Sequence, residues 1–178
     1  MKLLLAACFA AISVAANAAS AKWEFAGKVV PGSAGEERAS YYTMLIFNQT
    51  DAAAVTAALS GETVDYDALN SLKLDSVQAA KAGSFSGQVN DITGSSVTLF
   101  GVAFDTAATG DSITTASNYY RTGTITVGTY DPTGTDEPTT ATFTSAQMTG
   151  TWTPVPEPTA VALLLLGAAG LALRRKRV

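Results

Sequence analysis

Residues 97–104 have the sequence VTLFGVAF, and this stretch decides the fold. Strict alternation of apolar and polar residues would predict a half-exposed strand, but here apolar residues occupy both faces of an extended chain. The stretch is also rich in the β-branched and aromatic residues that favour strands. We therefore expect a central strand of a β-sheet.

Further strands are expected on both sides of this stretch. Residues 41–47 (YYTMLIF) are similarly dense in apolar residues, whereas 22–29 and 119–130 alternate with the period of two that is typical of half-buried strands. The stretch 119–130 ends at a turn formed by 131–134 (DPTG). In the last candidate, 141–152, the apolar residues change phase at Thr144 and Ser145, which predicts a β-bulge or a break between two strands.

One segment has the pattern of a helix. Asp51 can cap a helix that places Val55, Ala58 and Leu59 on one side, and Gly61 can end it. Residues 65–72 and 75–82 are expected to add further turns. The expected fold is mainly β: an antiparallel β-sandwich-like ectodomain with a helical insertion within residues 51–82, followed by a single C-terminal transmembrane helix.

The composition excludes many functional classes. The 178 residues include no histidine, and the only cysteine is Cys8, so Ser-His-Asp and Cys-His catalysis, His-ligated metals, zinc clusters and disulfides are excluded from the domain. Residues 22–155 hold 14 acidic and 6 basic residues, a net charge of −8, which repels nucleic acid. We expect no cofactor, no metal site and no enzymatic activity.

The N-terminus has the pattern of a cleaved signal peptide, assigned to residues 1–21. Lys2 supplies a positive charge, residues 3–14 form a short apolar run, and small residues follow. Two A-x-A triplets, at 16–18 and 19–21, offer cleavage after Ala18 or after Ala21, and the sequence leaves both open. The exported β-rich domain is then expected to span residues 22–153.

Residues 154–178 have three parts in a fixed order. A proline-rich hinge comes first, then an apolar segment at 159–173 that can form a transmembrane helix about 22 Å long. Four cations end the chain. Because Lys and Arg next to a span stay on the cytoplasmic side, the domain is expected outside. The basic stop-transfer cluster comprises Arg174, Arg175, Lys176 and Arg177.

This tail resembles the PEP-CTERM sorting signal. The resemblance covers residues 155–178, and the tripeptide Pro156, Glu157 and Pro158 is the part that carries it. It implies an exported protein of a Gram-negative bacterium that is processed by exosortase, a membrane protease-transpeptidase, in lineages that make exopolysaccharide. The implied partners are exosortase, the inner membrane before processing and exopolysaccharide. The implied localisation is the inner membrane with a periplasmic domain, then the cell surface or medium.

Few residues of the ectodomain suggest chemistry. Residues 65–70 (DYDALN) begin like a calcium loop but lack its later ligands, so a helix cap is the favoured interpretation, and Asp131 is assigned to a solvated turn with Asp136 and Glu137. Glu36 and Glu37 are sequence neighbours, which does not make them a glycosidase pair.

Two tyrosine pairs, 41–42 and 119–120, could stack on sugar rings or be ordinary strand residues. The sequence therefore predicts a non-enzymatic surface or extracellular-matrix protein, associated with exopolysaccharide or biofilm. The alternative is a secreted carbohydrate-binding protein, or one that acts on polysaccharide through carboxylates.

Overall fold

The computed structural model describes residues 19–25, 41–80, 85–106, 111–135 and 138–156, and it is mainly β. Helices α1 (Ala52–Ser60) and α2 (Tyr66–Leu72) lie between the second and third strands, and two 3-10 turns, η1 (Gln49–Asp51) and η2 (Ser145–Gln147), complete the elements. The strands are β1 (Ala19–Phe25), β2 (Tyr41–Asn48), β3 (Asp75–Ala80), β4 (Phe85–Ile92), β5 (Ser96–Phe104), β6 (Asn118–Gly128), β7 (Thr140–Phe143) and β8 (Thr153–Pro154).

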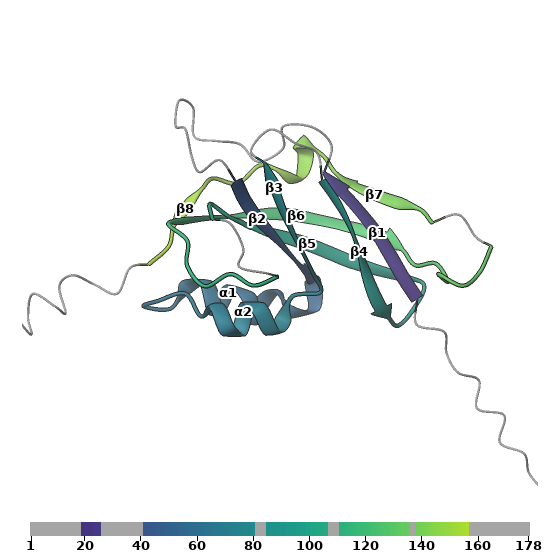
Figure 1. Cartoon of the computed structure of the whole chain (residues 1–178), viewed down its shortest axis with the longest axis horizontal. Helices are drawn as coiled ribbons and strands as arrows, with labels where there is room; N and C mark the ends of the chain where they lie inside the picture. The colour runs from purple at the N-terminus through teal and green to yellow at the C-terminus, as the bar shows by residue number, and fades with distance from the viewer. Residues whose placement is uncertain (1–18, 26–40, 81–84, 107–110, 136–137, 157–178) are drawn as a thin grey trace, which may run out of the picture.

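The strands form two sheets. One has three strands in the order β4-β1-β7, and the other has five in the order β3-β2-β5-β6-β8. Every pair is antiparallel except β1 and β7, which run parallel. Helices α1 and α2 cover the face of the five-stranded sheet that points away from the smaller sheet (Figure 1). The described part of the chain therefore has three layers: small sheet, large sheet and helices.

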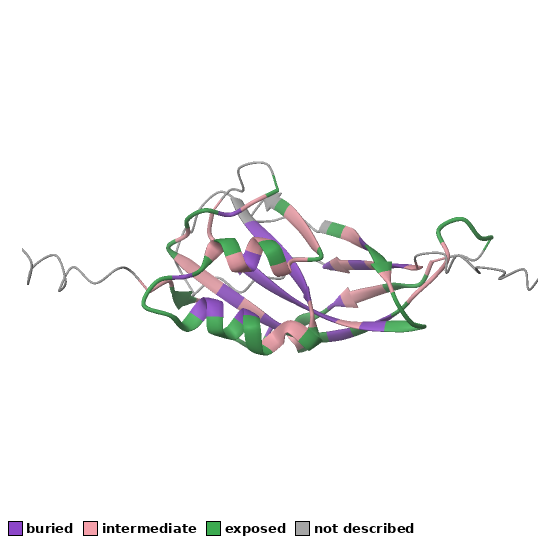
Figure 2. Ribbon diagram, turned by 90° about the horizontal axis from the view of Figure 1, so that it is seen from below, coloured by how far each residue is buried: buried purple, intermediate pink, exposed green. Residues whose placement is uncertain are grey.

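This layering explains why the stretch that includes β5 is apolar on both faces. Val97, Leu99 and Ala103 point into the core shared with the small sheet, whereas Phe100 and Phe104 pack beneath the helices. The burial pattern of β5 shows no alternation after its first residues, and Figure 2 shows buried positions running through the middle of the large sheet. The prediction of a strand apolar on both faces is confirmed, with the helices covering its second face.

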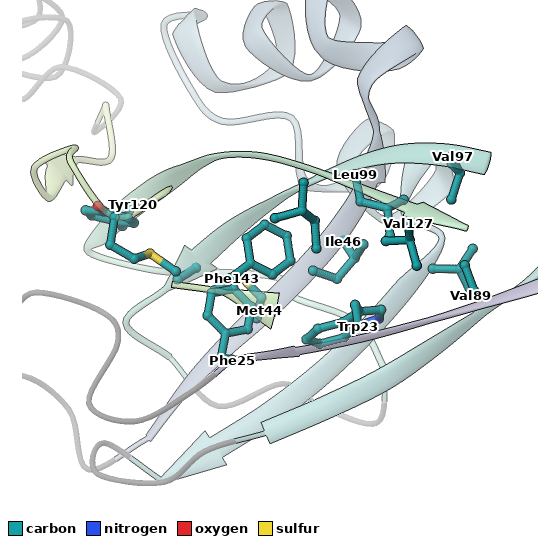
Figure 3. Packing of buried hydrophobic residues seen from close by; sticks show 14 residues of the cluster. Trp23, Phe25, Met44, Ile46, Val89, Val97, Leu99, Tyr120, Val127 and Phe143 are labelled. Carbon is teal, nitrogen blue, oxygen red and sulfur yellow. The ribbon is translucent and has the colours of Figure 1, made fainter. Parts of the chain in front are cut away.

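The core between the sheets is built around aromatic side chains (Figure 3). Trp23 and Phe25 of β1 are 0% and 1% exposed, and the ring of Phe25 stacks on Phe143 with centroids 4.4 Å apart. The indole Nε1 of Trp23 donates a 2.9 Å hydrogen bond to Oδ2 of Asp75 at the start of β3. That bond joins the small sheet to the large one.

The helical insertion begins with a turn that the sequence did not indicate. Asp51 precedes α1, but it ends the 3-10 turn η1, and its side chain makes no capping bond. The buried residues of α1 are Val55, Ala58 and Leu59, as expected. Asp65 caps α2 by accepting from the backbone N–H of Ala68 at 2.9 Å.

The expectation of helical turns over 75–82 is wrong, because residues 75–80 form strand β3. Their pairing with β2 supplies backbone hydrogen bonds that a local helix would otherwise make, and Val77 packs against the core. Tertiary pairing thus overrides the weak local preference of this alanine-containing segment.

The phase change at Thr144 marks a break. Strand β7 ends at Phe143, and Thr144 with Gln147 forms a capping box around η2. Residues 148–152 do not continue as a strand, and pairing resumes only at β8. The described fold also reaches further than expected at both ends, because β1 begins at Ala19 and β8 includes Pro154.

Candidate processing junction and surface cavities

The sheet continues up to the start of the C-terminal tail. Strand β8 pairs with the beginning of β6, with Asn118 opposite Pro154 and Tyr119 opposite Thr153. One residue later, the backbone N–H of Val155 donates to the carbonyl of Ser117 at 2.9 Å, and Val155 packs against the helix-side core. The folded domain therefore extends to Val155, directly before Pro156, the last described residue.

The carboxylate of Asp105 fixes the segment against which the tail is seated. It accepts hydrogen bonds from the backbone N–H groups of Ser117 at 2.9 Å and Asn118 at 2.7 Å, and from the Asn118 side chain at 2.7 Å. A charged acceptor with three donors holds its neighbours strongly. The sequence alone did not indicate this role, although an acidic residue directly after an apolar strand was a visible signal.

The chain that leads into β8 is anchored by aromatic residues. The Tyr120 hydroxyl accepts from the backbone N–H of Gly150 at 2.9 Å, and the rings of Tyr120 and Trp152 lie 5.8 Å apart. Burial raises the pKa of Tyr120 above its usual value. Tyr120 is fully buried in the core, and the half-buried ring of Tyr119 has its centroid 6.4 Å from that of Phe104, so the two rings do not form one exposed platform for sugar stacking. The side chains of Tyr41 and Tyr42 lie outside the described residues.

The acidic candidates have structural roles where the structure describes them. Asp65 is a helix cap, and Asp131 closes the expected turn, since its carbonyl accepts from the Gly134 N–H at 3.0 Å. Glu36, Glu37, Asp136 and Glu137 lie outside the described residues. Within the described ranges, no group of three or more acidic or Cys residues is placed to hold a metal ion.

Burial raises the pKa of the Asp75 carboxyl, and hydrogen bonds from Trp23, Ser76 and Gln88 offset part of that effect. A raised carboxyl pKa is a property that general acids share. Here, however, the carboxylate accepts hydrogen bonds from the indole N–H of Trp23 and, at 2.8 Å, from the backbone N–H of Ser76. Because the bond from Trp23 connects the two sheets, we assign Asp75 a role in sheet packing.

Two open surface cavities stand out. One, of about 580 Å³, is bordered by the end of β2, the end of β4 and the start of β5, and amide and hydroxyl side chains such as Asn48, Asn90 and Thr98 line it. Its lining includes Leu74, the one large apolar residue exposed among those described, at 40%. The other, of about 870 Å³, lies along α1 and α2 and includes Asp65, Tyr66 and Asp67.

The expected membrane span at 159–173 lies outside the described residues, as do Glu157, Pro158 and the basic cluster of 174–177. Among the helices that are described, none is both long and apolar enough to cross a membrane. The structure thus describes the domain up to its last strand, and the tail is interpreted from its sequence.

A comparison with protein families matches residues 154–177 to the PEP-CTERM protein-sorting motif. The tail is a PEP-CTERM sorting signal. This motif implies an exported surface protein that exosortase processes, first anchored in the membrane and then placed at the cell surface or released. Comparisons with curated proteins and with solved structures find no match. The PEP-CTERM match begins at Pro154, so its first two residues belong to the folded sheet.

Proposed function

We propose that the chain is a non-enzymatic surface or extracellular-matrix protein whose β domain associates with exopolysaccharide after exosortase has processed its tail. The observation that carries the proposal is the PEP-CTERM motif at 154–177, attached without a spacer to a domain whose last strand is β8. Three of the described carboxylates serve structural roles: Asp65 caps a helix, Asp131 closes a turn and Asp75 accepts from Trp23 between the sheets.

The tail has two separable tasks in this proposal. Its apolar segment and basic end hold the precursor in the inner membrane, because moving four adjacent cations through lipid is costly. The tripeptide Pro156, Glu157 and Pro158 is recognised by exosortase. Cleavage of the tail then releases a domain that carries a net charge of −8 over residues 22–155, which keeps it soluble.

The test is a double substitution, Pro156→Ala with Glu157→Ala, in a host that contains exosortase. The membrane span and topology should remain, while uncut precursor accumulates in the membrane fraction. The sequence offers a matched control in Glu137→Ala with Pro138→Ala, which removes the same two residue types outside the motif and should mature normally. Normal maturation of the tripeptide variant would reduce the tail to a plain anchor.

A second variant separates retention from recognition. Replacing residues 174–177 with serine should weaken membrane retention and orientation, since the positive charges that stop transfer are lost. Fractionation and intact mass distinguish this defect from uncut precursor. Equal retention of this variant and the wild type would contradict the stop-transfer role.

The cavity bordered by β2, β4 and β5 supports exopolysaccharide as the partner, because amides and hydroxyls recognise sugar hydroxyls and Leu74 adds an apolar contact. Leu74→Glu should weaken co-sedimentation of the released domain with the host's own exopolysaccharide. Thr124→Glu, at an exposed site on β6 outside this cavity, is the control with the same new charge. Equal co-sedimentation of both variants and the wild type would argue against this cavity.

A further inference from the structure

The first three residues of β1 are integral to the fold. β1 is the central strand of the small sheet, between β4 and β7, and Ala19 and Ala21 pair with Ile92 and Val89 of β4. Ala21 is fully buried in the core between the sheets. The domain therefore starts before Lys22.

Ser20 is fixed on three sides. Its backbone N–H and carbonyl exchange two hydrogen bonds of 2.9 Å with the backbone of Tyr130, and its hydroxyl donates to Oδ1 of Asn90 at 2.8 Å. Ser20 is 1% exposed, so these groups would be costly to leave without partners. Asn90 lies in β4 of the small sheet, whereas Tyr130 follows β6 of the large sheet, so Ser20 also joins the two layers at this end of the molecule.

The two A-x-A triplets of the leader differ in what cleavage would do to this structure. A cut after Ala21 would remove the whole segment Ala19 to Ala21, with the buried Ala21 and all the bonds of Ser20. A cut after Ala18 would leave β1 complete, because the strand begins at the next residue. Both triplets satisfy the small-residue rule equally, so the fold provides the discrimination that the sequence lacks.

We propose that the leader is removed by a signal peptidase at the Ala18–Ala19 bond. One water molecule adds across this amide, which leaves a carboxylate on Ala18 and a free α-amine on Ala19. The inference rests on the proposed export of the chain, and it fixes the first residue of the mature domain as Ala19. The leader is then residues 1–18, the shorter of the two alternatives that the sequence leaves open.

The first experiment is N-terminal sequencing of the full chain after expression in a Gram-negative host and isolation from the envelope. The expected sequence is Ala-Ser-Ala-Lys-Trp. A sequence that starts Lys-Trp-Glu would overturn the assignment. A sequence that still starts at Met1 would show no cleavage after either Ala18 or Ala21. It would overturn the proposed export and the cleavage that rests on it.

A second experiment measures the rate of leader cleavage, which does not depend on the stability of the folded domain. It uses a matched pair of variants at two adjacent alanines. Ala18 occupies the last position of the first triplet, whereas Ala19 occupies the first position of the second. Ala18→Leu should raise the fraction of uncut precursor several-fold in a short pulse-chase, and Ala19→Leu should mature at the wild-type rate. The reverse result, with precursor accumulating only in Ala19→Leu, would place the cut after Ala21 and overturn the proposal.

Discussion

Gly87 lies opposite Trp23 in the β1–β4 pair of the small sheet, close to Asp75 at the start of β3 in the large sheet. A Cβ atom at Gly87 would lie 2.6 Å from Cζ2 and 2.8 Å from Cε2 of Trp23, and it would overlap the Asp75 carboxylate. Gly87→Ala therefore requires the indole or the carboxylate to move. Either movement strains the hydrogen bond that joins β1 to β3.

The expected loss of stability combines two effects. Overpacking a core position costs about 1 to 3 kcal/mol, and a hydrogen bond to a charged acceptor contributes about 1.5 to 3 kcal/mol. Alanine recovers about 0.5 to 1 kcal/mol of backbone entropy relative to glycine. A net loss of about 3 kcal/mol is a large share of the roughly 5 to 15 kcal/mol that stabilises a domain, and it corresponds to about 10 °C in melting temperature.

The assay is urea and thermal unfolding of the released domain, with Gly128→Ala as the control. Gly128 also lies in a strand, but no heavy atom lies within 4 Å of an added Cβ there, so its substitution should be nearly neutral. Combining Gly87→Ala with Asp75→Ala should cost less than the sum of the single losses, since the carboxylate no longer obstructs the new methyl group. Equal stability of the Gly87 and Gly128 variants would refute the sheet packing described above.

Three further predictions concern the same domain. Burial raises the pKa of Asp75 in the folded state, so protonation of Asp75 stabilises the fold. This contribution to the free energy of unfolding is full below about pH 4 and is lost as the pH rises through the folded pKa. In urea unfolding, Asp75→Asn should therefore flatten the decrease of stability with pH. A domain that begins at Lys22 should melt about 10 °C below one that begins at Ala19, because about 3 kcal/mol from three hydrogen bonds is lost. EDTA should leave the melting temperature unchanged, and a large decrease would contradict the prediction of a metal-free fold.

The sequence predicted most strands because hydrophobic periodicity reports burial directly. The apolar run at 97–104 and the alternation around Trp23 were sufficient to place β5 and β1. Periodicity does not report partners, however, so the parallel pairing of β1 with β7 could not be anticipated. The same limit explains the error at 75–80, where pairing with β2 makes a strand of a segment with weak local preference.

The register of β6 shows a second limit. Within the alternating stretch 119–130, Ile125 and Val127 are buried in one phase, but Tyr120 and Thr122 are buried in the opposite phase. The register of the β5–β6 pair shifts between Phe100 and Val102, and Oγ1 of Thr122 accepts from the Gly101 N–H at 2.8 Å. Such a bulge turns Tyr120 into the core, so its aromatic side chain could not serve the sugar platform that its sequence position suggested.

The sorting tail was recognisable from sequence because its recognition depends on linear order: tripeptide, apolar segment, basic end. Its relation to the fold was not, since nothing local shows that Pro154 and Val155 belong to the sheet.

The capping box at Thr144 was a readable signal, because Ser or Thr followed three residues later by Gln is its usual pattern.

The two ends of the domain differ in what it costs to expose them to a protease. The start of β1 is bonded on both sides, to β4 and to Tyr130, and buries Ala21. Strand β8 has two exposed residues and pairs only with β6, so detaching it breaks few hydrogen bonds, each worth about 1 kcal/mol. The proposed cut after Ala18 is therefore expected on a chain that has not yet folded, whereas we expect the PEP-CTERM signal to become accessible on the folded domain once β8 detaches.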